Sequence, residues 1–167
     1  MNETEANQPA VPPATAVAVL LAPVTACLRG DDEGLRVLFD GACEDGTLPA
    51  ALHAAPSVAR VYLRIAPTPD GVDRILAGYI GGALDRFGDR EVVAIGAECL
   101  EIARANREIA PIADAVFVDA ALGHGRWNAM VGAVACCWWC AERGAALRGT
   151  DPVAETAAIC RYLARVA

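Results

Sequence analysis

The chain contains no lysine, a single serine and only two histidines, and these shortages narrow the chemistry that it can perform. Without lysine it cannot form the Gly-x4-Gly-Lys loop that holds nucleotide phosphates. The one serine, Ser57, precedes a predicted helix, where its hydroxyl would cap free backbone N–H groups. We therefore interpret Ser57 as a helix cap, and a serine hydrolase would lack its nucleophile.

Basic charge is also scarce, with 14 arginines against 21 acidic residues and a net charge of −7. No basic cluster is available to neutralise phosphates, so we expect no nucleic-acid partner. No stretch reaches the roughly 18 apolar residues of a membrane span, so we expect no membrane association. The charge is uneven: residues 1–45 carry eight acids against two arginines, whereas residues 46–167 carry thirteen against twelve. The acidic N-terminal portion would suit a basic partner.

Apolar residues make up 55% of the chain, and 36 residues are alanine. Alanine favours helices that pack closely, and aromatic residues are few, so the composition predicts an all-α fold. Apolar positions recur at helical spacing between glycine and proline turns. This pattern indicates antiparallel helical hairpins packed as a compact bundle or a short solenoid. Residues 1–14 are polar and proline-rich and are expected to be a disordered tail, followed by one helical domain over residues 15–167.

Helix starts are marked by capping residues and prolines. Thr47-Leu48-Pro49 predicts a short helix, and Ser57 caps a second one. Thr68-Pro69-Asp70 predicts a helix that continues to Leu84, and Asp89 begins another. The helix predicted from Arg126 carries the densest chemical feature of the chain, the run Cys136-Cys137-Trp138-Trp139-Cys140.

On a helical wheel, Cys136, Cys137 and Cys140 share one arc, which Ala129 and Ala133 extend into a face of small residues. The helix is apolar nearly all round, so we expect it to be central and buried. Its thiols admit three interpretations: tight packing, a redox pair, or a zinc or other soft-metal site. A metal site would need further ligands from among Cys99, Cys160, His53 and His124.

A pocket for a small molecule is a further hypothesis, lined by Tyr79, Trp127, Trp138 and the thiols. The seven cysteines are odd in number and irregularly spaced, unlike a secreted disulfide framework. We therefore expect reduced thiols and a cytoplasmic location.

Residues 75–122 resemble the cofactor half of class I S-adenosylmethionine methyltransferases. The motif Gly78-Tyr79-Ile80-Gly81-Gly82 corresponds to the glycine-rich loop, Glu91–Ile95 to the next strand, and Phe117–Ala120 to a strand carrying the acid Asp119. The resemblance implies a Rossmann-like α/β fold, which is the alternative to the all-α bundle, with Asp119 at a cofactor-binding position. It departs from the family pattern where Ile80 replaces the central glycine.

Together these observations favour a non-catalytic helical protein-protein interaction or regulatory module that binds a protein partner or a second copy of itself. A helical protein that binds a small molecule or a soft metal is the first alternative, and a degenerate methyltransferase-like enzyme is the second. We expect no cofactor, with zinc at Cys136, Cys137 and Cys140 as the alternative.

Overall fold

Several helices begin where the sequence places a capping side chain. At α6 (Arg90–Ala105), Oδ1 of Asp89 accepts a hydrogen bond from the Glu91 backbone N–H at 2.8 Å. At α4 (Pro69–Leu76), Oγ1 of Thr68 accepts one from the Gly71 backbone N–H at 3.1 Å. These oxygens satisfy N–H groups that have no partner within the helix, which confirms both predicted starts.

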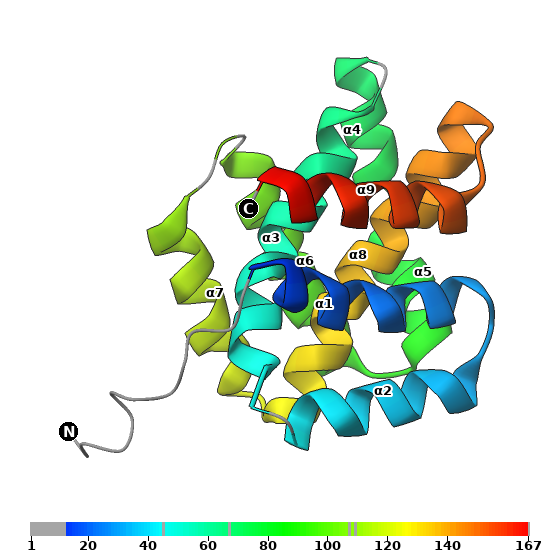
Figure 1. Ribbon diagram of the computed structural model, residues 1–167. Coiled ribbons are helices and arrows are strands. Elements are labelled where there is room, and N and C mark those ends of the chain that lie inside the picture. The colour runs from blue at the N-terminus through cyan, green and yellow to red at the C-terminus, as the bar shows by residue number, and fades with distance from the viewer. Residues whose placement is uncertain (1–12, 45, 67, 107, 109, 167) are drawn as a thin grey trace.

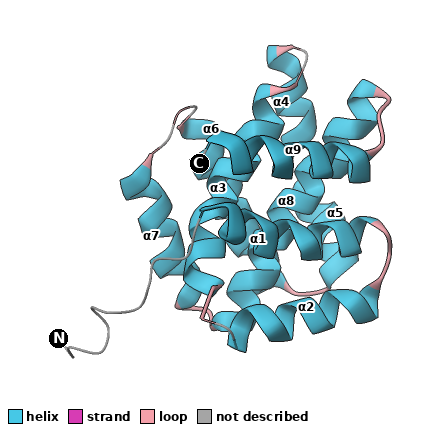
Figure 2. Ribbon diagram, in the orientation of Figure 1, coloured by secondary structure: helices cyan, strands magenta, loops and turns pink. Residues whose placement is uncertain are grey.

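The computed structural model describes residues 13–44, 46–66, 68–106, 108 and 110–166 (Figure 1). All regular elements in these ranges are helices, and none is a strand (Figure 2). Besides α4 and α6 they are α1 (Pro13–Leu28), α2 (Asp32–Glu44), α3 (Leu48–Arg64), α5 (Tyr79–Phe87), α7 (Pro111–Leu122), α8 (Arg126–Arg148) and α9 (Pro152–Val166). The all-α prediction is confirmed, and the Rossmann-like α/β alternative is wrong.

Helix α8 forms the centre of the bundle. Every residue from Ala129 to Ala141 is buried, and α8 contacts each of the other described helices. Neighbouring helices cover α8 on all sides along this stretch, so the predicted central position of the thiol helix is confirmed. Gly132 allows α6 to approach α8 closely, because a Cβ at this position would lie 2.5 Å from Cγ2 of Ile95 on α6.

Helices α1 and α2 form an antiparallel hairpin that lies across α8 (Figure 1). The turn between them contains Gly30, whose φ of 70° is readily adopted only by glycine. Helix α1 contacts α3, α8 and α9 as well as α2, and it carries no charged residue. These contacts leave one stripe of α1 exposed, formed by Ala14, Thr15, Ala18 and Ala22.

Helix α1 begins at Pro13, two residues before the predicted start of the helical domain. The rest of the predicted tail, residues 1–12, lies outside the described residues. Among the helices that the structure describes, none combines the length and the apolar character that a membrane crossing requires.

Candidate functional site

The three clustered thiols lie inside the core. Cys136, Cys137 and Cys140 have no exposed surface, and the equally buried Cys99 of α6 joins them. Burial raises the pKa of the Cys136 thiol well above its usual range, and side-chain hydrogen bonds with Cys137, Cys140 and Cys99 raise it further. A thiol held neutral is a poor nucleophile, so this environment disfavours redox chemistry.

Metal binding at the same thiols gains no support from their arrangement. The residues that the structure describes contain no group of three or more histidine, cysteine, aspartate or glutamate side chains that could hold a metal ion. The two histidines lie on the surface: His53 is an exposed residue of α3, and Nδ1 of His124 lies 3.6 Å from Oε1 of Glu91. Zinc at Cys136, Cys137 and Cys140 remains a prediction for elemental analysis.

The aromatic residues predicted to line one pocket lie in two places. The Tyr79 ring packs edge-on against Trp139, and Trp138 packs against the same indole from its neighbouring position. Trp127 instead lies at the start of α8, 42% exposed, with its ring 5.3 Å from that of Phe39. Eleven residues of helix separate the Trp127 and Trp138 backbones by roughly 16 Å. Tyr79 and Trp138 therefore each pack against Trp139, and Trp127 lies apart from them.

The glycine-rich segment of the methyltransferase resemblance packs against an indole. A Cβ at Gly82 would lie 2.0 Å from Cζ3 of Trp139, and the indole Nε1 donates a hydrogen bond to the Ile75 carbonyl. The predicted strand Glu91–Ile95 lies within helix α6, and Asp119 is an exposed residue of helix α7. The fold implied by the resemblance is therefore wrong, and close packing accounts for the glycine at position 82.

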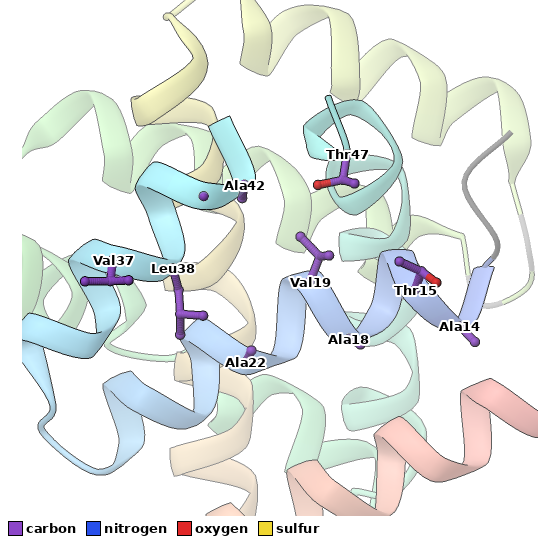
Figure 3. Close-up of a pocket in the computed structure, with 10 residues that line it drawn as sticks. Ala14, Thr15, Ala18, Val19, Ala22, Val37, Leu38, Ala42 and Thr47 are labelled. Atoms are coloured by element: carbon purple, nitrogen blue, oxygen red, sulfur yellow. The ribbon is translucent and has the colours of Figure 1, made fainter. Parts of the chain in front are cut away.

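An apolar groove lies between α1 and α2 at the start of α3. Its volume is about 550 Å³. Figure 3 shows it extending from Ala14 and Thr15 past Val19 to Leu38 and Val37, with Thr47 above it. The full lining is Ala14, Thr15, Ala18, Val19, Ala22, Val37, Leu38, Gly41, Ala42 and Thr47. We call this surface the α1–α2 groove.

Small side chains on both helices create the α1–α2 groove. Ala14, Ala18 and Ala22 recur at steps of four residues, which places them in one row along α1. Gly41 contributes no side chain on the α2 side, while Val37 and Leu38 stand 62% and 37% exposed. The groove therefore has a shallow floor and exposed aliphatic walls, against which a row of side chains from another molecule could pack.

Thr47 supplies the one buried polar side-chain atom without a hydrogen-bond partner among the described residues, its Oγ1. Thr47 stands at the N-cap of α3 but has helical dihedral angles, φ −86° and ψ −9°, and its side chain caps no N–H group. An N-cap oxygen normally reaches the helix from an extended backbone. Figure 3 shows the oxygen turned toward the α2 side of the groove.

A second, smaller hollow of about 360 Å³ lies between α3 and α9. Its lining includes Arg64 and Glu155, and Glu155 already accepts hydrogen bonds from Arg148. The α1–α2 groove has no charged residue in its lining and has the larger volume of the two. It is therefore the stronger candidate for a binding surface.

Comparison of the chain with protein-family models, with curated proteins and with solved structures finds no match.

Proposed function

We propose that this chain is a non-catalytic protein-interaction module that binds a helix of a partner protein in the α1–α2 groove. The observation that carries the proposal is the groove itself, in which Val37 and Leu38 remain exposed beside a row of small side chains. Exposed aliphatic side chains at the wall of a groove lose contact with water when a partner covers them. Their burial would supply part of the binding free energy.

The shape of the α1–α2 groove suits a helix. Packed helices place the ridges of one into the grooves of the other, and residues four apart form such rows. The row of Ala14, Ala18 and Ala22 is shallow, so the backbone of a docked helix can come close to α1. An amphipathic helix that buries its apolar face in a groove is a recurrent mode of recognition.

The side chains of the groove favour binding over catalysis. Apart from Thr15 and Thr47, the lining residues are aliphatic or glycine, and such surfaces recognise shape rather than transfer protons. The seven cysteines are all unpaired, which supports the cytoplasmic location that we infer for this interaction.

Val37→Asp tests the proposal, with Val116→Asp as the matched control. Both valines are exposed on helices, 62% at Val37 on α2 and 56% at Val116 on α7. Neither substitution should change the free energy of unfolding by more than about 0.5 kcal/mol, because neither removes core packing. Val37→Asp should weaken partner binding at least about tenfold, because it would bury an unpaired carboxylate in the interface.

The measurement is capture from cells that produce the chain naturally, followed by titration of the purified partner against the wild type and both variants. A partner that binds the wild type and Val116→Asp but loses affinity for Val37→Asp supports the groove. Equal affinity for all three proteins contradicts it. Sedimentation of the purified chain tests whether a second copy of the chain occupies the groove. A wild-type dimer that Val37→Asp dissociates would identify the second copy as the occupant.

A further inference from the structure

One edge of the α1–α2 groove is acidic. On a helical wheel with Val37 at 0°, the groove residues Gly41 and Leu38 lie at roughly 40° and roughly 100°. Three exposed acids lie immediately on the other side of Val37, at roughly 300° to 340°: Glu33, Asp40 and Glu44. Helix α2 therefore presents apolar residues to the groove and a row of carboxylates along its outer edge.

The acidity is concentrated in the part of the chain that forms the groove. Residues 31–44, which comprise α2 and the residue before it, carry five acids against one arginine, while residues 46–167 are close to balanced, with thirteen against twelve. Helix α1 carries no charge, and α2 carries one arginine, Arg36, at roughly 260° on the same wheel. Three carboxylates against one guanidinium leave this edge with an excess of negative charge. A ligand that approaches the groove therefore meets a negative field, which repels nucleic acids and anionic lipid surfaces and attracts a basic protein surface.

We propose that the partner is an amphipathic helix with a basic edge, an inference that rests on the function proposed above. The apolar row of this helix enters the groove, and its arginines or lysines face Glu33, Asp40 and Glu44. A neutral or acidic helix would leave these carboxylates partly desolvated without partners. Complementary charges at a rim also raise the association rate and exclude wrong partners.

The spacing of the acids predicts the spacing of the cations. Glu33 precedes Asp40 by seven residues, and Asp40 precedes Glu44 by four. These steps correspond to about 10 Å and about 6 Å along the axis of α2. A helix that lies along α2 has the same rise per residue, so its cations should occur at i, i+7 and i+11, or at i, i+4 and i+11 in the reverse orientation. Both sets fall on one face of a helix, as such an edge requires.

Two synthetic helical peptides of about 18 residues test the inference against the full chain. Both peptides carry the same leucine row. One peptide has lysine at i, i+4, i+7 and i+11, and the other has glutamate at these positions. The four positions include the cation spacings predicted for both orientations. Fluorescence anisotropy at about 0.05 M salt should give the lysine peptide about tenfold higher affinity than the glutamate peptide. At about 0.5 M salt the difference should shrink, because exposed charges are screened.

The double variant Asp40→Asn/Glu44→Gln should reduce the preference for the lysine peptide to about threefold or less. The control is Glu98→Gln/Glu101→Gln, which removes two exposed acids from α6, a helix that contributes nothing to the groove lining. This control should retain the preference. If it loses the preference equally, overall charge rather than the acidic edge is responsible, and the inference is overturned.

The remaining outcomes separate the inference from the proposed function. If both peptides bind equally and Val37→Asp abolishes both, the groove binds helices without selecting charge, which overturns only the inference. Tighter binding of the glutamate peptide overturns it as well. If neither peptide binds, the inference also fails. The proposed function then fails only if Val37→Asp leaves the affinity for the captured partner unchanged.

Discussion

Asp114→Ala should destabilise the fold more than any surface substitution, because it breaks a buried ion pair. Nη1 of Arg60 on α3 donates to Oδ2 of Asp114 on α7 at 2.9 Å, and Nη2 donates to Oδ1 at 2.6 Å. The two side chains are only 3% and 1% exposed. Nε of Arg60 donates to the backbone carbonyl of Asn106 at 2.7 Å, so one guanidinium joins α3 to the end of α6 and to α7.

The expected magnitude follows from what remains after the substitution. Asp114→Ala would leave the Arg60 guanidinium buried with a single backbone acceptor, and breaking such a pair costs about 3–5 kcal/mol. Replacing both partners, as in Arg60→Met/Asp114→Leu, should cost far less, because no unpaired charge stays in the core. For a chain of this size the single variant should lower Tm by about 6–20 °C.

The assay is urea unfolding followed by circular dichroism at pH 7, with Asp73→Ala as the control. Asp73 lies 3.8 Å from Arg104 in an exposed pair, so its loss should change the free energy of unfolding by less than about 0.5 kcal/mol. A loss below about 1 kcal/mol in Asp114→Ala would refute the reasoning, because it would mean that the Arg60 guanidinium reaches water in solution.

Two further predictions concern the packing around α8. Gly82→Ala should lower the free energy of unfolding by about 1–3 kcal/mol and shift the fluorescence of Trp139, because a Cβ at position 82 would lie 2.0 Å from the Trp139 ring. Gly81→Ala is the control and should be neutral or slightly stabilising, because a Cβ at position 81 would meet no atom within 4 Å. Equal effects of the two substitutions would contradict the packing account. A thiol reagent should label Cys43 and Cys160 rapidly in the native protein and the other five cysteines only after unfolding, because those five are buried. Rapid labelling of a third thiol would show that the core opens.

Much of the helical structure was predictable from local signals. Asp89 and Thr68-Pro69 gave correct helix starts because a cap depends on residues within one turn of it. Ser57 was interpreted wrongly: it lies in the middle of α3, which continues through Pro56. The predicted helix from Pro69 to Leu84 is in fact two, because Gly78 adopts a φ of 80° between them.

The candidate site was less predictable, because it depends on contacts between helices. The row Ala14, Ala18 and Ala22 is visible in the sequence, but α1 is apolar on every side, so its periodicity does not reveal which face stays exposed. The ion pair of Arg60 and Asp114 could not be predicted from local sequence, because it joins residues 54 positions apart. Asp114 gave no signal by itself either, because acids are common in the first turn of any helix. Only the packed bundle distinguishes these residues from their neighbours.

The most direct test of the α1–α2 groove is amide hydrogen exchange of the full chain with and without its purified partner. The account predicts added protection in residues 14–22 and 37–47, which contain the groove lining, and unchanged exchange in α7 around Val116. Added protection centred on α7, with none in the groove segments, would contradict it.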